Sequence, residues 1–224
     1  MTSARTDVAL IFGSTREEHL CDDVAMWAAE QAWSQRHFSL DVVGPAEFAS
    51  PMPRRHGDSA EVTALRQRLR KADAFVLVTP EYDHGHVAAL IRLMDATAAE
   101  WQAKPVGLVA YGGSSGGLRA VEQLRLLCAE RHAVTVPAAV NFTDVRRQFD
   151  ASGHLRQPHG PTVAMAAMLE QLQWWAVALH AARQKQPYAL VGDRRGAYSP
   201  AGFKSGATSI GSAGSAAHSC SEAV

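Results

Sequence analysis

The sequence carries no net charge, which limits the classes of molecule that we expect it to bind. Its 22 basic side chains are matched by 22 acidic ones. A dedicated nucleic-acid-binding domain normally shows a basic excess, and so does a protein that binds a membrane surface through a polybasic patch. We therefore expect neither nucleic acid nor a membrane as a partner. Hydrophobic residues make up 47% of the chain and charged residues 20%, which excludes wholesale disorder.

Cysteines are few, and long apolar runs are absent. Cys21, Cys128 and Cys220 lie far apart and form no C-x-x-C motif, which is typical of reduced thiols rather than of a disulfide framework. The apolar run at 8–12 is too short for the core of a signal peptide. No uncharged apolar run approaches the roughly 18 residues that span a bilayer. We expect a cytoplasmic protein.

The chain instead contains strand-like and helix-like segments in alternation. Short apolar runs predict strands at 8–12, 38–43, 74–78, 106–111 and 134–140. Helical spacing of apolar residues predicts helices at 22–36, 59–71, 87–101 and 163–184. A further helix is predicted from the end of the glycine-rich turn at 112–117 to about residue 132. Strands that recur about every 30 residues and alternate with helices indicate right-handed βαβ units. The expected fold class is α/β, a three-layer sandwich around a five-stranded parallel sheet.

The C-terminal segment has a different composition. From Gly196 to Val224, 19 of 29 residues are Gly, Ser or Ala. Such a segment buries too little apolar surface to offset the entropy that it would lose on ordering. We therefore expect one folded domain over residues 1–189 and a disordered tail over residues 190–224.

Three loops at predicted strand ends have the composition of a ligand site. In an open parallel sheet, ligands bind at the carboxyl ends of the strands. The loop at 13–16 (Gly-Ser-Thr-Arg) offers a sharp turn, hydroxyls and an arginine, which suit a phosphate group. It matches neither a nucleotide-triphosphate loop nor the dinucleotide fingerprint. The loop at 79–86 combines a proline, an aromatic ring and acids, and the loop at 112–117 offers four glycines and two serines.

Two of these loops admit other chemistry. Asp83, His84 and His86 could ligate a metal, although no further ligand cluster is evident. The run Gly112–Gly116 satisfies the G-x-S-x-G pattern of a hydrolase, with Ser114 as the nucleophile. A hydrolase also needs an acid and a histidine, for which the candidates are Asp144, Asp150, His154, His159 and His180. A hydrolase would leave the loop at 13–16 unexplained, whereas all three loops together suit a mononucleotide with a flat ring. The combination favours a flavin mononucleotide (FMN) site.

The same residues resemble a known family. The segments 11–16 (Ile-Phe-Gly-Ser-Thr-Arg), 79–84 (Thr-Pro-Glu-Tyr-Asp-His) and 104–119, which begins Lys-Pro-Val-Gly-Leu-Val-Ala-Tyr-Gly-Gly, are similar in order and spacing to the NADPH-dependent FMN reductases. The resemblance covers roughly residues 7–185. It implies a flavodoxin-like sheet of order 2-1-3-4-5, usually in a dimer, with FMN at the strand ends and NADPH or NADH as the electron donor.

The resemblance also implies which residues bind the cofactor. Ser14 and Arg16 would hold the FMN phosphate. Pro80, Glu81, Tyr82 and Asp83 would line the ribityl chain and one side of the isoalloxazine ring, and Gly112, Gly113 and Ser114 would meet its pyrimidine edge. The family commonly has asparagine at the position of Asp83. A carboxylate there would disfavour an anionic reduced flavin unless it is paired, and Arg92 is the candidate partner.

The implied function is that of an FMN-dependent NAD(P)H oxidoreductase. Hydride would pass from NAD(P)H to flavin N5 and on to a small acceptor such as free flavin, a quinone or an azo compound. Because the flavin carries the chemistry, we expect no catalytic side chain and no bound metal. A flavin-dependent monooxygenase is a candidate partner, and we expect a homodimer or a dimer of dimers. The alternatives are a serine hydrolase that uses Ser114 and a flavodoxin-like electron carrier, although such carriers are typically strongly acidic.

Overall fold

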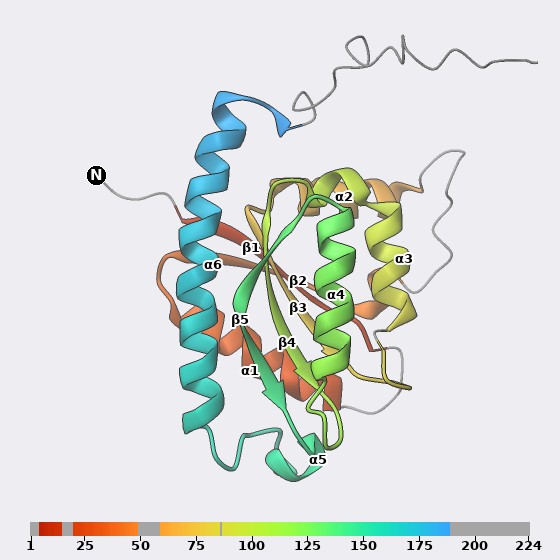
Figure 1. Cartoon of the computed structure of the whole chain (residues 1–224), viewed down its shortest axis with the longest axis vertical. Coiled ribbons are helices and arrows are strands. Elements are labelled where there is room, and N and C mark those ends of the chain that lie inside the picture. The colour runs from red at the N-terminus through yellow and green to blue at the C-terminus, as the bar shows by residue number, and fades with distance from the viewer. Residues whose placement is uncertain (1–4, 15–19, 49–58, 86, 189–224) are drawn as a thin grey trace, which may run out of the picture. The chain divides into compact units, whose positions relative to one another are not determined.

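Five parallel strands pair in the order β2-β1-β3-β4-β5 and form one sheet (Figure 1). The computed structural model describes residues 5–14, 20–48, 59–85 and 87–188. The strands are β1 Thr6–Phe12, β2 Phe38–Val43, β3 Ala74–Pro80, β4 Pro105–Tyr111 and β5 Val134–Phe142. The predicted α/β class and strand order are confirmed. Arg16, His86 and the predicted tail over 190–224 lie outside the described residues.

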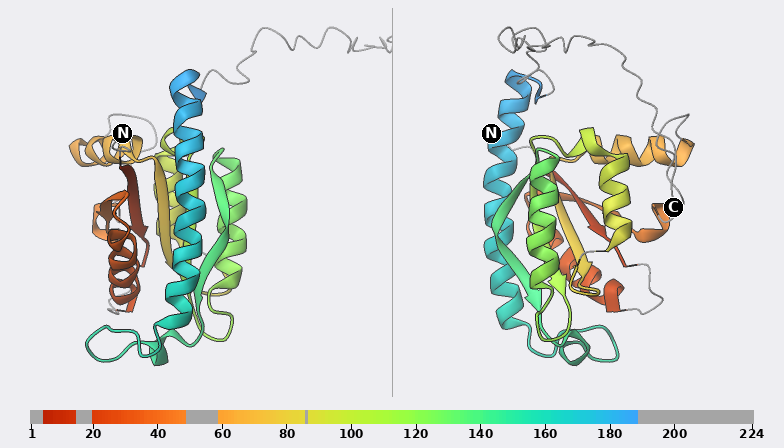
Figure 2. Two further views of the ribbon diagram at one scale, coloured as in Figure 1. Left: turned by 90° about the vertical axis from the view of Figure 1, so that its left-hand side faces the viewer. Right: turned by 45° about the vertical axis from the view of Figure 1, so that its right-hand side comes forward.

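Helices cover both faces of this sheet. They are α1 Leu20–Ser34, α2 Ala60–Lys71, α3 Ala88–Ala96, α4 Leu118–Glu130, α5 Val145–Gln148 and α6 His159–Lys185. The helices α1 and α6 pack on one face, and α2, α3 and α4 pack on the other (Figure 2). The short α5 follows the end of β5, where the sequence predicted no helix.

The central strands are buried on both sides. In β3, Val76 and Val78 belong to the core cluster under α1 and α6, whereas Phe75 and Leu77 belong to the cluster under α2, α3 and α4. Every residue of β3 and β4 is buried, which explains why both strands have continuous apolar sequences. Burial of each large apolar side chain contributes roughly 1.5–3 kcal/mol, so these strands give their end loops a firm base.

Side-chain hydrogen bonds stabilise the ends of two helices. Ser59 caps α2 as predicted, because its side chain accepts a hydrogen bond from the Val62 amide at 3.3 Å. The single helix predicted over 87–101 is wrong: α3 ends at Ala96 and a 3-10 turn follows over Ala98–Trp101. The Thr97 hydroxyl donates to the Leu93 carbonyl at 2.7 Å and accepts from the Trp101 indole at 2.9 Å, and these bonds stabilise the break.

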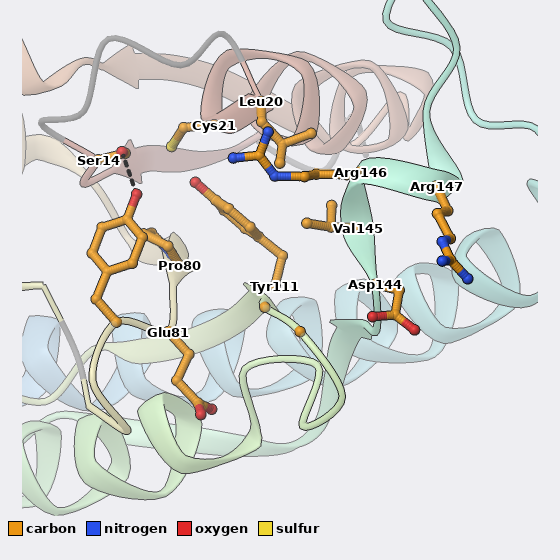
Figure 3. Close-up of a pocket in the computed structure, with 13 residues that line it drawn as sticks. Ser14, Leu20, Cys21, Pro80, Glu81, Tyr111, Asp144, Val145, Arg146 and Arg147 are labelled. Atoms are coloured by element: carbon orange, nitrogen blue, oxygen red, sulfur yellow. Dashed lines mark hydrogen bonds between the residues drawn. The ribbon is translucent and has the colours of Figure 1, made fainter.

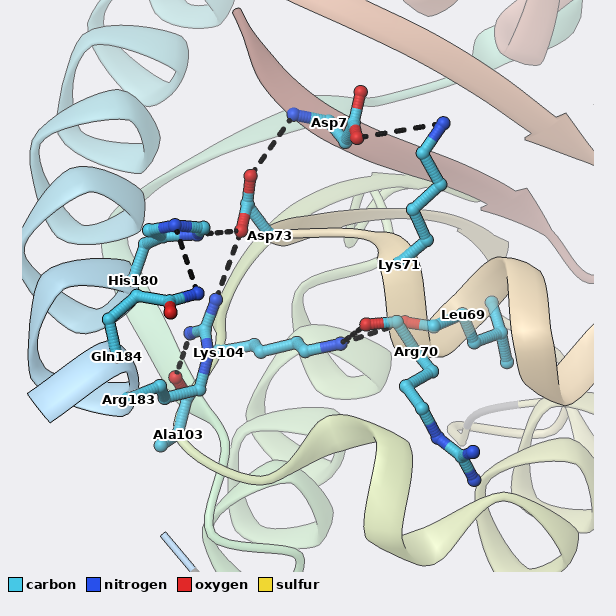
Figure 4. Close-up of polar contacts among 10 residues, drawn as sticks. All are labelled: Asp7, Leu69, Arg70, Lys71, Asp73, Ala103, Lys104, His180, Arg183 and Gln184. Atoms are coloured by element: carbon cyan, nitrogen blue, oxygen red, sulfur yellow. Dashed lines mark hydrogen bonds and ion pairs between the residues drawn. The ribbon is translucent and has the colours of Figure 1, made fainter. Parts of the chain in front are cut away.

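The amino-terminal edge of the sheet carries a polar network around Asp73 (Figure 4). The Asp73 carboxylate accepts hydrogen bonds from His180 and Arg183, both on α6. Arg183 also donates to the Ala103 carbonyl at 2.6 Å. Asp73 precedes β3 and Ala103 precedes β4, so the network ties the C-terminal part of α6 to the amino ends of the two central strands.

Lys104 is a buried cation beside this network (Figure 4). Its Nζ donates to the carbonyls of Leu69 and Arg70, at 2.8 and 2.9 Å, in the last turn of α2. Burial lowers the pKa of Lys104 to about 8, and the nearby positive charge of Arg183 acts in the same direction. The ammonium group therefore caps α2 while it carries a desolvation penalty.

The outer strand β5 has an irregular stretch whose backbone groups form hydrogen bonds with side chains from two helices. The register with β4 shifts between Val106 and Leu108, opposite residues 135–139 of β5. Arg125 of α4 donates to the carbonyls of Val136 and Pro137 at 2.7 and 2.8 Å. Gln171 of α6 accepts a hydrogen bond from the Ala138 amide at 2.9 Å. At the opposite edge of the sheet, Arg68 of α2 donates to the Val42 carbonyl of β2.

Candidate functional site

A cavity of about 310 Å³ lies at the carboxyl ends of β1, β3, β4 and β5 (Figure 3). Its volume is at the lower end of the range for small-molecule sites. The lining residues come from all four strand ends and from the start of α1: Ser14, Leu20, Cys21, Pro80, Glu81, Tyr82, Tyr111, Gly112, Gly113, Asp144, Val145, Arg146 and Arg147. Ligands of open parallel sheets bind at this edge.

Hydroxyl groups gather at one end of the cavity. The Ser14 hydroxyl lies 3.1 Å from the Tyr82 hydroxyl, and Ser14 is only 5% exposed. The Tyr111 hydroxyl contacts Ser14 and the Cys21 thiol. Burial raises the pKa of Tyr111 and that of Cys21, so both groups stay protonated at neutral pH. The described hydroxyl and thiol groups at this end of the cavity are therefore polar and able to donate hydrogen bonds. We call Ser14, Tyr82 and Tyr111 the hydroxyl cluster.

A tight turn follows β3 and sets the direction of Tyr82. The amide of Tyr82 donates to the Gly85 carbonyl at 3.1 Å, and the Gly85 amide donates back at 2.8 Å. Between them, Asp83 and His84 have positive φ values of 47° and 63°. Two central residues with positive φ define a type I′ turn, in which aspartate is well tolerated. Asp83 is exposed and does not line the cavity, so its observed role is in the turn.

Glu81 joins the loop after β3 to the start of α4. Its side chain is 6% exposed. The carboxylate accepts a hydrogen bond from the Ser115 hydroxyl at 2.9 Å and one from the Arg119 amide at 3.0 Å. The Arg119 guanidinium lies 3.6 Å away and balances the charge. Although Glu81 lines the cavity, Figure 3 shows its carboxylate directed toward α4. It therefore fixes two loops relative to each other.

The glycine-rich loop after β4 is held by the end of β5. The Gly112 amide donates to the Phe142 carbonyl at 3.1 Å, and the Gly113 carbonyl accepts from the Asp144 amide at 3.0 Å. A Cβ atom on Gly113 would meet no protein atom within 4 Å, and Gly113 lines the cavity. The backbone at Gly113 is thus open to close approach by a flat ligand.

The end of β5 adds a charged wall that the sequence did not predict as part of this site. Asp144 has a positive φ of 44° and is the N-cap residue, immediately before the four-residue helix α5. Arg146 and Arg147 on α5 are exposed and line the cavity. The only sequence signal was two arginines after a strand end at the same edge of the sheet. That pattern is equally typical of an ordinary surface turn.

Comparison with known proteins assigns the family. The NADPH-dependent FMN reductase family matches residues 6–146, which is more than half of the chain. The chain belongs to this family. Its members use FMN, with NAD(P)H as the electron donor.

Two relatives and one solved structure define the extent of the likeness. An NAD(P)H-dependent FMN reductase of Schizosaccharomyces pombe is 30% identical over 119 residues, which are 49% of this chain and 60% of that protein. An FMN-dependent NADPH-azoreductase of Staphylococcus saprophyticus is 32% identical over 146 residues, 62% of this chain and 70% of that one. An oxidoreductase structure from Corynebacterium diphtheriae superposes with a TM-score of 0.60 at 17% identity, over 79% of this chain and 99% of that one. At that identity the structure supports the fold alone.

The cavity contains most of the cofactor-binding residues predicted from the resemblance to FMN reductases. Ser14, Pro80, Glu81, Tyr82, Gly112 and Gly113 line it. Asp83 and Ser114 are described but do not line it, and Arg16 lies outside the described residues. Arg92 is exposed on α3 and makes no ion pair with Asp83 in the described part of the chain. Tyr111, Cys21 and the wall formed by α5 are additions to the predicted set.

The alternative sites are not assembled among the described residues, which exclude His86. His180 bonds to Asp73 at the opposite edge of the sheet, and His154 lies 3.8 Å from Asp150 in the turn before α6. Neither pair involves Ser114. Among the described residues, no three His, Cys, Asp or Glu side chains gather as a metal would require. Within the same residues, no helix has the length and apolar character needed to cross a membrane.

The residues of the cavity fit the cofactor of FMN reductases. The hydroxyl cluster offers hydrogen-bond donors for an anionic group. The open backbone at Gly113 accommodates a flat ring, and the Tyr82 side chain lines the same cavity as an aromatic wall. A phosphate at one end and a planar ring at the other are the two parts of FMN that a site must hold.

Proposed function

We propose that this protein is an FMN-dependent NAD(P)H oxidoreductase that passes electrons from a nicotinamide nucleotide to a small acceptor. Family membership and one structural observation support the proposal: four strand ends enclose a cavity with hydroxyl donors at one end and an open glycine backbone at the other. The match covers only 60% of the S. pombe relative, so the full activity is inferred from the part that the two proteins share.

The residues that bind the cofactor would divide into three groups. Ser14 and Arg16 hold the phosphate. Pro80, Glu81, Tyr82 and Asp83 flank the ribityl chain and one side of the ring, with Glu81 fixing the loops and Asp83 shaping the turn. Gly112, Gly113 and Ser114 meet the pyrimidine edge. Because the Gly112 amide is already bonded to Phe142, we assign the ring contact of this loop chiefly to Gly113.

The protein's part in the reaction would be to bind and orient. Bound FMN supplies a two-electron carrier that takes hydride from NAD(P)H and returns electrons to the acceptor. Residues of the turn after β3 keep the Tyr82 ring beside the cavity, and Glu81 keeps that turn against the glycine-rich loop. The described residues of the cavity need no general base for this function. The raised pKa of Tyr111 makes that phenol a hydrogen-bond donor rather than a base.

The physiological acceptor is a finer proposal. The relationship to an azoreductase supports an azo compound as the acceptor, and free flavin and a quinone are the other candidate acceptors. We also propose a homodimer or a dimer of dimers in the cytoplasm, with NADPH or NADH as donor and a flavin-dependent monooxygenase as a candidate recipient of reduced flavin.

One experiment tests the proposed function. The purified full-length protein should be yellow or take up added FMN, and it should oxidise NADPH in air. Arg16→Ala should weaken the binding of FMN far more than that of riboflavin, because only FMN has the phosphate. Equal loss for both flavins would refute the role of Arg16. A colourless protein that neither binds FMN nor consumes NADPH, and that hydrolyses an ester through Ser114, would refute the proposed function.

A further inference from the structure

The long helix α6 has apolar residues on two faces, and one of these faces packs on the sheet (Figure 2). The outer face carries a second row of residues, all of them exposed: Val163, Ala167, Glu170, Trp174, Val177 and Ala181. We call these six residues the α6 seam. A helix that is apolar on every side is normally covered on every side. The α6 seam is therefore a candidate contact surface.

The α6 seam has the spacing of a helix-pairing surface. Its members follow one another at alternating intervals of four and three residues, which keeps them on one stripe of the helix. From Val163 to Ala181 the stripe is about 27 Å long, at a rise of about 1.5 Å per residue. The flanking positions 164, 166, 171, 173 and 178 are alanine or glutamine. A second helix can therefore approach the seam closely without meeting a like charge at these positions.

Two exposed tryptophans lie on the same helical layer. Trp174, near the centre of the seam, is 65% exposed, and its ring packs edge-to-face on Trp175 at a centroid distance of 5.1 Å. Trp33 of α1, the helix that lies against α6, is 74% exposed. Tryptophan is enriched among the residues that dominate binding at interfaces. With Met26 of α1 and the two valines of the seam, these rings present on the order of 500 Å², more than half of the roughly 800 Å² that each partner buries in a typical specific interface.

The charges of α6 fit a second copy of the same helix in antiparallel orientation. Glu170 is the acidic member of the seam, and the last turn of α6 is basic, with Lys185 exposed. A parallel copy would place two Glu170 carboxylates side by side within the contact, which is unfavourable. An antiparallel copy with Trp174 opposite Val177 places Glu170 opposite Ala181, one helical turn from Lys185 of that copy. The seam is thus complementary to itself in the antiparallel orientation.

We propose that two copies of the chain pair through antiparallel α6 helices, with α1 at the flank of the contact. The proposal goes beyond the proposed function, because it assigns the homodimer a surface and does not depend on flavin binding. The inner row of α6 then packs on the sheet of its own chain, and the outer row packs on the second copy.

The first test measures the oligomeric state of the full-length protein by sedimentation over a range of concentrations. Trp174→Glu should raise the dissociation constant of the dimer about 30-fold or more, the range for loss of a buried aromatic residue at an interface. Val177→Glu should act in the same direction. Leu126→Glu is the matched control, because Leu126 is 71% exposed on α4 at the other face of the sheet, and it should change the constant less than about threefold. Because all three positions are exposed, the Tm of the dissociated variants should show an intact fold. If the wild type is a tetramer, Trp174→Glu should yield dimers.

Single cysteines test the orientation of the two helices. In a Cys220→Ser background, the other native cysteines, Cys21 and Cys128, are buried. Val177→Cys should form an intermolecular disulfide on mild oxidation, because antiparallel pairing brings the centres of the two seams together. Val163→Cys should not, because its two copies then lie at opposite ends of the contact.

The charges provide an independent test of the same arrangement. Glu170→Lys should weaken the dimer, because it places a second cation near Lys185 of the other copy. The double variant Glu170→Lys, Lys185→Glu should recover part of the loss.

Several outcomes would overturn the proposal, and none of them depends on flavin. A wild-type protein that stays monomeric at micromolar concentration would refute it and leave the seam to a different protein. A dimer that Leu126→Glu dissociates and Trp174→Glu does not would assign the contact to α4. Disulfides at both Val163→Cys and Val177→Cys would refute the antiparallel orientation. A protein that binds no FMN but dimerises through α6 would refute the proposed function and leave this proposal standing.

Discussion

Replacing each of two glycines in one loop by alanine should separate folding from flavin binding. A Cβ atom on Gly113 meets no protein atom within 4 Å, and Gly113 lines the cavity. A Cβ atom on Gly117 would lie 2.7 Å from Ala110 Cβ and 2.8 Å from the Tyr111 nitrogen, at a φ of 84°. The first methyl group would enter the space that we assign to the flavin ring. The second would enter the packed end of β4.

The expected stability changes follow from these contacts. Gly117→Ala should lower the free energy of unfolding by about 2–5 kcal/mol, because left-handed backbone costs other residues roughly 1–2 kcal/mol and overpacking roughly 1–3 kcal/mol. For a domain of this size that loss corresponds to a decrease in Tm of roughly 4–20 °C. Gly113→Ala should leave stability unchanged or raise it by up to about 1 kcal/mol, because alanine reduces the entropy of the unfolded chain.

Flavin binding should respond in the opposite order. Gly113→Ala should weaken FMN on the order of 10-fold or more, since a ring that contacts the backbone at Gly113 must move to admit the methyl group. Thermal unfolding without flavin measures the stability, and quenching of FMN fluorescence measures the affinity. Gly113→Ala protein that binds FMN as tightly as wild type would refute the position of the ring. Gly117→Ala protein with wild-type stability would refute the steric argument.

Three further predictions concern buried groups. Tyr111→Phe should weaken the binding of FMN about 5- to 10-fold and that of riboflavin less, because a neutral hydrogen bond contributes roughly 1 kcal/mol. A fluorescence titration measures both affinities. Equal FMN affinities of variant and wild type would exclude a phosphate contact for this hydroxyl. The pKa of Lys104 is about 8 when folded and near 10.5 when unfolded, so the unfolded chain binds more protons between these values and stability should rise with pH, by about 1 kcal/mol from pH 7.5 to 9. Urea unfolding of the wild type and of Lys104→Met, at several pH values, isolates the contribution of Lys104 to the free energy of unfolding. A difference in this free energy between the two proteins that does not change with pH would contradict the prediction. Burial raises the pKa of Cys21 and raises that of Cys128 to about 12. Neither thiol should therefore react readily with iodoacetamide at pH 8 in the native protein. Rapid labelling of either cysteine, detected by mass spectrometry, would show that the thiol is accessible to solvent.

The sheet and its strand-end loops were predictable because they depend on local sequence patterns. The buried strand β3 appears as a continuous apolar run, and Gly13 follows β1 where a turn is needed. The reason for glycine at that position is not local. A Cβ atom on Gly13 would lie 2.4 Å from Leu90 Cγ, so α3 can approach the end of β1 only if this side chain is absent.

Other features depend on neighbours that the sequence does not place. The break after α3 relies on the Trp101 indole reaching back to Thr97. Tyr111 ends an apolar strand, and only the folded arrangement brings its hydroxyl to Ser14. Arg146 follows a strand that is last in the sheet, so its approach to the start of α1 depends on three-dimensional packing.

Asp83 shows how residue chemistry and backbone geometry can suggest different roles. The sequence directed attention to its carboxylate, because an acid near a flavin ring would alter the charge of the reduced cofactor. The structure shows instead a left-handed backbone in a two-residue turn, which aspartate and asparagine both tolerate. The exchange of asparagine for aspartate thus preserves the geometry that holds Tyr82, and the charge is left in solvent.

The side chains that satisfy the irregular part of β5 also affect how two copies of the chain could meet. A sheet can extend from one molecule into another only if backbone groups at its outer strand are available. Arg125 and Gln171 occupy such groups at residues 136–138, and Arg68 occupies the Val42 carbonyl on β2. Joining two sheets would first require these bonds to break. Strand addition at these particular residues should therefore begin only after α4, α6 or α2 has moved away.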